Sequence, residues 1–165
     1  MDKLLRVAAL ATLVPVSGNA EPMPDFPDHA SAQRITRHCL SVEYASALAG
    51  ALGAKLANSS LEPGESKYSS QVNLKQPSDW VLRTVGGVKE AEAAFKTAIE
   101  WEPNWRSHGE TYWAALLTDH TPYNVREGQI LLDQTFACMA HFVSMADQQG
   151  SPPFTNQIKK VPFPD

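Results

Sequence analysis

SAQRITRHCLSVEYASALAGALGAKLA, residues 31–57, contains no proline and repeats apolar or small residues at spacings of three and four. That spacing places them on one face of an α-helix. Asp28 or Ser31 can cap the first turn. The stretch therefore predicts a long amphipathic helix that buries one face, made of Ile35, Cys39, Val42, Ala45, Ala49, Leu52 and Leu56.

Small residues recur on this face at Ala45, Ala49 and Gly53. They would let a second helix approach closely, either from the same chain or from a second copy in a homodimer. Gly50 and Gly53 weaken the second half of the helix, because each glycine costs about 1 kcal/mol relative to alanine in a helix interior.

Three further segments carry helical signals. Residues 78–101 keep the helical period on either side of Gly86-Gly87, where we expect a break. Ser107 and Glu110 match a capping box that opens a short helix ending before Pro122. Asn124 and Glu127 can open a last helix that runs to about Gln149, with Gly150 and two prolines after it. The sequence thus predicts an all-α bundle of four to five helices, forming a single domain over residues 21–165.

The segment NSSLEPGESKYSSQVNLKQ, residues 58–76, is polar and has no helical period. We expect a long loop after the first helix, and such loops are either functional or disordered connections. SSQVNLK within it has strand character but no evident partner. Residues 21–29 and the tail after residue 153 are expected to be extended.

The amino terminus, MDKLLRVAALATLVPVSGNA, has a basic start, a short apolar run and small residues at its end. This is the pattern of a secretory signal peptide, with cleavage after Ala20. The apolar run is about half the roughly 20 residues that a membrane-spanning helix needs. We therefore expect export to the bacterial periplasm without a membrane anchor, and full secretion is an open alternative.

The net charge of the chain is −4, and removal of the leader takes away two basic residues and one acidic residue. Proteins that bind nucleic acid owe much of their affinity to lysine and arginine on phosphates. The acidic balance, without a basic stripe, argues against a nucleic-acid partner.

The two cysteines, Cys39 and Cys138, lie on the apolar faces of the first and last predicted helices. Exported proteins with two cysteines usually pair them, so we predict a disulfide between these residues. The alternative is a Cys2His2 metal site with His38 and His141. Adjacent residues such as His38 and Cys39 point about 100° apart on a helix and converge poorly on one ion. We expect no metal and no cofactor.

Two segments are candidates for contact with a protein partner. Tyrosine, tryptophan and arginine carry much of the binding energy at interfaces, and loops present function on a rigid scaffold. In the connection before the capping box we select Trp105, Arg106 and His108, and we expect Trp105 and His108 to be exposed while Trp101 fills the core. In the polar loop we select Glu62, Glu65, Lys67 and Tyr68.

The sequence contains no recognisable catalytic motif: it has no nucleophile elbow, no metal-binding helix motif and no phosphate-binding loop. We therefore expect a non-enzymatic protein that binds another protein. In size, export, helicity and its single disulfide it is similar to small exported helical immunity proteins, a resemblance that implies inhibition of a toxin acting on the cell envelope. The alternatives are a periplasmic carrier of a small ligand or cofactor, using His141, and an envelope hydrolase using His108 or His120.

Overall fold

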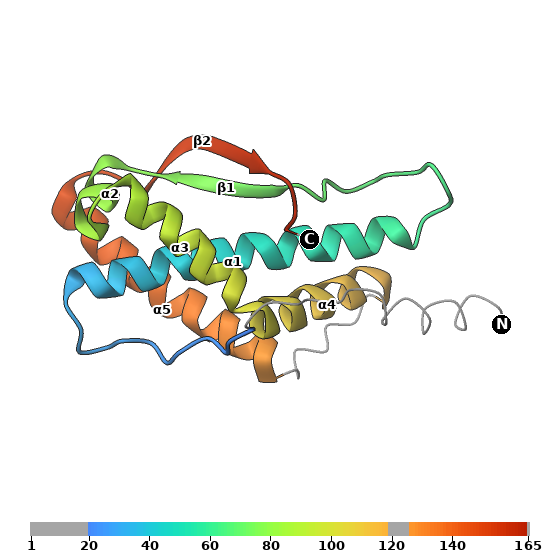
Figure 1. Cartoon of the computed structure of the whole chain (residues 1–165), viewed down its shortest axis with the longest axis horizontal. Helices are drawn as coiled ribbons and strands as arrows, with labels where there is room; N and C mark the ends of the chain where they lie inside the picture. The colour runs from blue at the N-terminus through green and yellow to red at the C-terminus, as the bar shows by residue number, and fades with distance from the viewer. Residues whose placement is uncertain (1–19, 119–125, 165) are drawn as a thin grey trace.

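The computed structural model describes residues 20–118 and 126–164, where helices and a two-stranded antiparallel sheet pack around one central helix (Figure 1). The predicted signal peptide, the cap at Asn124 and His120 lie outside the described residues, apart from Ala20. The described elements are α1 (Ala32–Ser59), β1 (Val72–Pro77), α2 (Asp79–Val85), α3 (Val88–Glu100), α4 (Glu102–Thr118), α5 (Arg126–Gln149) and β2 (Phe154–Val161).

Helix α1 is the predicted long helix, and its start is set by Ser31. The Ser31 side chain accepts a hydrogen bond from the Arg34 backbone N–H at 3.3 Å, which satisfies one of the free donors of the first turn. α1 contacts α2, α3, α4, α5 and β1. Leu40 and Leu48 are 0 % exposed, so α1 is buried by neighbours along its length rather than lying on the surface.

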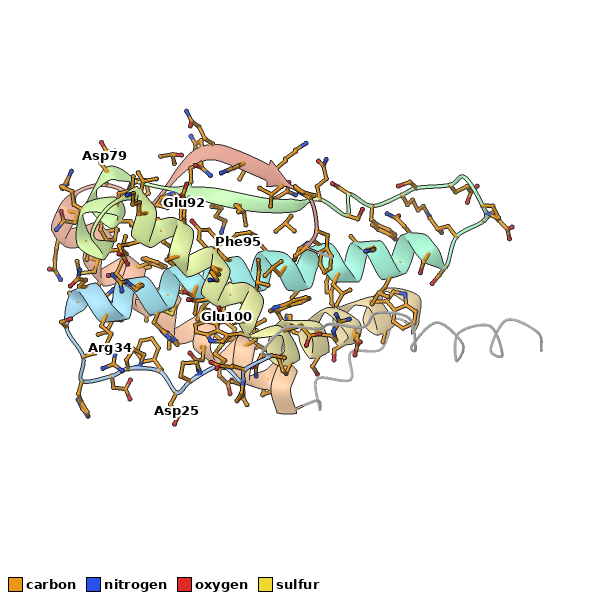
Figure 2. All side chains as sticks on the ribbon, in the orientation of Figure 1. Asp25, Arg34, Asp79, Glu92, Phe95 and Glu100 are labelled. Atoms are coloured by element: carbon orange, nitrogen blue, oxygen red, sulfur yellow. A yellow bond between two sulfur atoms is a disulfide. The ribbon has the colours of Figure 1, made fainter. Side chains whose placement is uncertain are left out.

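The predicted break at the glycine pair is confirmed. Gly86 and Gly87 have φ angles of 105° and 111°, a left-handed region that side chains with a Cβ rarely adopt. They separate α2 from α3 and let α3 turn back along α1. There Phe95, which is labelled in Figure 2, packs edge-on against Tyr44 of α1, with ring centroids 5.8 Å apart.

The predicted helical architecture is confirmed, since five helices make up most of the described fold, but the fold is not strictly all-α. β1 pairs with β2 in antiparallel register, Val72 opposite Val161 and Leu74 opposite Lys159. Val72 and Leu74 are buried, whereas Asn73 and Lys75, each the next residue along, are exposed, which is the alternation of a half-buried strand. The strand partner is the tail after residue 153, which the sequence predicts to be extended but for which it gives no partner. The loop after α1 is therefore shorter than predicted and ends at Gln71.

The predicted disulfide between Cys39 and Cys138 is confirmed. It joins α1 to α5, with the two Cα atoms 5.1 Å apart. Both sulfur atoms are used, so the alternative metal site is wrong. His38 instead donates a hydrogen bond to the Gln134 side-chain oxygen, and His141 pairs with the Thr36 hydroxyl at 2.9 Å.

Burial shifts the pKa values of both histidines downward, in favour of the neutral ring. Burial lowers the pKa of His38, the positive charge of Arg34 acts in the same direction, and the hydrogen bond to Gln134 opposes both. Burial also lowers the pKa of His141. The interface between α1 and α5 thus contains two polar pairs made by histidines in addition to the disulfide.

Within residues 20–118 and 126–164, no helix combines the length and the apolar character that crossing a bilayer requires.

Candidate functional site

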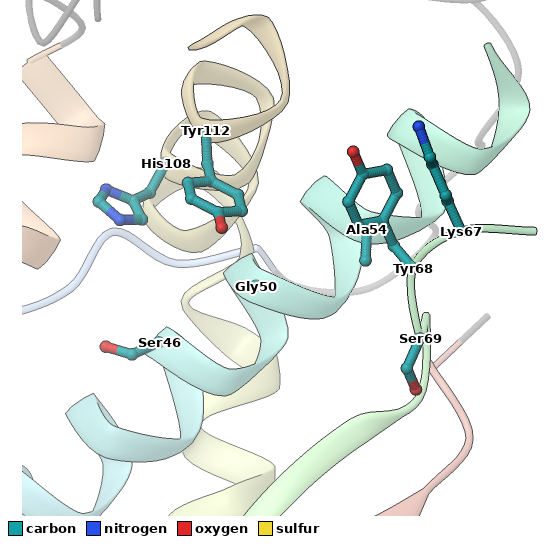
Figure 3. Close-up of a pocket in the computed structure, with 8 residues that line it drawn as sticks. All are labelled: Ser46, Gly50, Ala54, Lys67, Tyr68, Ser69, His108 and Tyr112. Carbon is teal, nitrogen blue, oxygen red and sulfur yellow. The ribbon is translucent and has the colours of Figure 1, made fainter. Parts of the chain in front are cut away.

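A groove with a volume of about 490 Å³ lies between α1, α4 and the loop that joins α1 to β1 (Figure 3). We call it the α1–α4 groove. It is lined by Ser46, Gly50 and Ala54 of α1, by Lys67, Tyr68 and Ser69 of the loop, and by His108 and Tyr112 of α4.

Glycines shape the floor of the groove and the helix contact beside it. A Cβ added at Gly50 would meet no atom within 4 Å, so this position opens into free space. A Cβ at Gly109 of α4 would lie 2.7 Å from the Ala49 carbonyl oxygen, and one at Gly53 would lie 2.7 Å from Cδ1 of Tyr112. The close approach predicted at Ala49 and Gly53 is therefore real, and the approaching helix is α4. The stripe is occupied inside the chain and is not free to form a homodimer.

The loop wall of the groove is held by Asn58, near the end of α1. Its side-chain oxygen accepts hydrogen bonds from the backbone N–H groups of Lys67 and Tyr68, at 3.0 and 2.9 Å. Its side-chain nitrogen donates to the Tyr68 carbonyl oxygen. Asn58 thus fixes the backbone that carries two lining residues, although its own side chain is not part of the lining. Lys67 forms no ion pair among the described residues.

The opposite wall comes from α4. Nδ1 of His108 lies 3.2 Å from the Gly128 carbonyl oxygen of α5. A carbonyl oxygen only accepts, so Nδ1 carries the hydrogen, and Nε2 is not used in this contact. Tyr112 and Tyr68, on opposite walls, are 49 % and 38 % exposed. The groove therefore presents two phenol rings to solvent.

Three of the predicted partner-binding residues meet in this groove: Lys67 and Tyr68 from the polar loop, and His108 from α4. Glu62 and Glu65 are exposed on the same loop but do not line the groove. Sequence reasoning did not select Gly50, Asn58 or Tyr112. Tyr112 carried a signal as part of the aromatic stretch 101–113. Asn58 carried one as an asparagine near the end of a helix, where its side chain can bond free backbone groups.

The expected exposure of Trp105 is wrong, because Trp105 is 2 % exposed and packs against the ring of Phe163, 5.7 Å away. The cause is an earlier helix start. α4 begins at Glu102, and Pro103 in its first turn needs no N–H partner there. Residues 105–108 are therefore helical rather than part of a connection.

Arg106 lies beside these rings and has partners of its own. It forms an ion pair with Glu102 one turn earlier, and its guanidinium lies 5.6 Å from the centroid of the Trp105 ring. Trp101 is 5 % exposed, as expected for a core residue.

Among the described residues proposed for other chemistry, His108 lines the groove and His141 does not. His141 pairs with Thr36 at the interface of α1 and α5 and does not line the groove, so its role in a carrier stays a prediction. In the part of the chain that the structure describes, no group of three or more histidine, cysteine or acidic residues is placed to hold a metal ion.

Comparison of the chain with protein-family models, with curated proteins and with solved structures gave no match. The geometry of the α1–α4 groove is therefore the ground for assigning a function.

Proposed function

We propose that the protein is an exported, non-enzymatic protein of the bacterial periplasm that binds another protein through the α1–α4 groove, as an inhibitor or immunity protein against a toxin acting on the envelope. The observation that carries the proposal is the convergence of Lys67 and Tyr68 with His108 and Tyr112 over the open position at Gly50. Exposed tyrosines supply large contact area with a polar tip, which suits them to protein interfaces.

Export is supported by the disulfide together with the leader pattern of residues 1–20. Disulfides form and persist in oxidising compartments such as the periplasm.

A binding role without catalysis is supported by how the polar groups of the groove are used. The Ser46 hydroxyl pairs with the Thr135 hydroxyl at 3.2 Å, and Nδ1 of His108 is bonded to the Gly128 carbonyl oxygen. A catalytic serine needs a base within hydrogen-bonding reach, oriented by a third group. The Ser46 hydroxyl bonds to Thr135 rather than to a base, and among the described residues no carboxylate lines the groove.

A carrier of a small ligand is the second candidate. The volume of about 490 Å³ falls within the range of roughly 300–1,000 Å³ that is typical of ligand pockets. Such a ligand would stack on the tyrosines and bond to Lys67 or His108. Purified protein with a bound small molecule, released by unfolding and seen by mass spectrometry, would favour this candidate.

The test of the proposed function is a binding experiment with Gly50→Trp, which fills the groove from its floor. The mature chain is immobilised and periplasmic extract is passed over it. We expect a partner retained at one-to-one ratio by the wild type to be lost with Gly50→Trp. The purified partner should degrade cell wall, and the wild-type protein should stop that degradation.

Two matched controls keep the result specific. Gly50→Ala leaves the groove open, and Ala93→Trp adds the same ring on the exposed surface of α3. Both should retain the partner as the wild type does. A partner that binds Gly50→Trp with undiminished affinity would place the binding surface elsewhere and contradict the proposal.

A further inference from the structure

The chain that precedes α1 is built into the fold over residues 21–24. The Met23 backbone N–H donates to the side-chain oxygen of Asn104 at 2.6 Å, and Asn104 is 2 % exposed. The side-chain nitrogen of Gln134 donates to the Pro24 carbonyl oxygen at 2.6 Å. α4 and α5 thus each hold this segment with a hydrogen bond from a side-chain amide.

The first anchored atom is the backbone nitrogen of Glu21, which donates to the carbonyl oxygen of Glu100 at 2.7 Å. Glu100 is the last residue of α3, and Figure 2 shows it beside the start of α4. The last carbonyl groups of a helix have no partner within it and carry partial negative charge. The last turn of α3 contains no basic residue that would neutralise this charge.

We infer that the Ala20–Glu21 peptide bond is a processing site, and that the amino terminus it releases docks as an ammonium group on the carboxyl-terminal end of α3. The inference rests on the proposed export. Ala20 is exposed, and the first backbone hydrogen bond to the rest of the fold is made by Glu21. The residue at which the anchored chain begins is therefore the residue that follows the predicted cleavage point.

The chemical step is hydrolysis by one water molecule, catalysed by a signal peptidase. The peptide C–N bond breaks, the oxygen of water becomes part of the new carboxylate of Ala20, and its two hydrogens are distributed so that Glu21 gains an ammonium group. The uncut chain offers Glu100 a neutral N–H at this point. The processed chain offers it a charged donor, and charge-assisted hydrogen bonds are the stronger kind.

The test compares three forms of the purified chain that differ only at the amino terminus. One begins at Glu21 with a free amine, one begins at Glu21 with an acetylated amine, and one retains residues 17–20. Acetylation keeps the N–H donor and removes only the charge. We expect the free form to melt about 1–4 °C above the other two, which should agree with each other.

Equal melting temperatures for the free and acetylated forms would overturn the inference. A chain that begins at Ser17 and has the same melting temperature as the free form would also overturn it. The processing site is measured separately, from the intact mass of protein exported to the periplasm. We expect an amino terminus at Glu21, whereas one at Met23 or later would remove the donor to Glu100. A failure of groove binding would leave both readouts unchanged, so the two proposals fail independently.

Discussion

The two halves of α1 are held in different ways. The half before Ser46 is tied to its neighbours by the disulfide, by the Arg37–Glu90 ion pair at 2.7 Å and by the pairing of His38 with Gln134. The half after it packs by close backbone approach at glycines and leaves one face open as the α1–α4 groove. One helix thus separates the cross-linked part of the fold from the proposed binding surface, and changes to each half should affect different properties.

The largest expected effect comes from removing the disulfide. The double variant Cys39→Ser with Cys138→Ser should lose about 2–5 kcal/mol of unfolding free energy, because the unfolded chain is no longer constrained across 99 residues. Urea denaturation followed by circular dichroism measures the loss, and reduction of the wild type should reproduce it. A loss below about 1 kcal/mol would mean that the first half of α1 is held mainly by packing.

A smaller effect is expected at the contact between α1 and α4. Gly109→Ala places a Cβ 2.7 Å from the Ala49 carbonyl oxygen, so the backbones must move apart. We expect a loss of about 1–3 kcal/mol, as for other overpacked sites, measured by the same denaturation.

Gly50→Ala is the matched control for this contact, since it adds the same methyl group where nothing lies within 4 Å. It should stabilise the chain by about 0.5–1 kcal/mol through helix propensity. A Gly109→Ala variant as stable as the wild type would show that the contact tolerates separation.

The smallest expected effect is the pH dependence of folding stability that comes from the two histidines between α1 and α5. His38 and His141 have lowered pKa values when folded, so at mildly acidic pH the unfolded chain binds more protons than the folded one. Their contribution to stability is complete above the ordinary histidine pKa of about 6.5 and declines as the pH falls below it. Melting temperatures between pH 7.5 and 5 should show this decline. The double variant His38→Gln with His141→Gln should show less of it, and an unchanged decline would assign it to other groups.

Local patterns predicted the helices well, because spacing, capping and glycine breaks act within a few residues. They failed where the partner is distant in the chain. Val72 and Leu74 show the alternation of a strand, but a strand is stable only when it is paired. The partner strand around Lys159 is exposed along most of its length, so it lacks the apolar pattern from which a strand is predicted. Pro103 was a usable signal for the start of α4 that the capping box at Ser107 obscured.

The groove could be predicted only in its parts. Tyr68 and His108 were selected from their residue types and their surroundings, but that they face one cavity depends on how α4 crosses α1. That crossing is decided by the absence of side chains at Gly53 and Gly109, and a glycine in a helix does not reveal which neighbour approaches it. Whether these residues bind a partner stays a prediction.

The central position of α1 has a consequence for how the chain acquires its fold. Synthesis produces α1 before its partners α5 and β1, and β1 in turn waits for β2, the last strand of the chain. Contacts between residues far apart in sequence form only at the cost of the conformational entropy lost when a long loop closes, so folding that depends on them is slow. The side of α1 that α5 covers is therefore exposed until the last part of the chain has been made, which is the period when aggregation competes with folding.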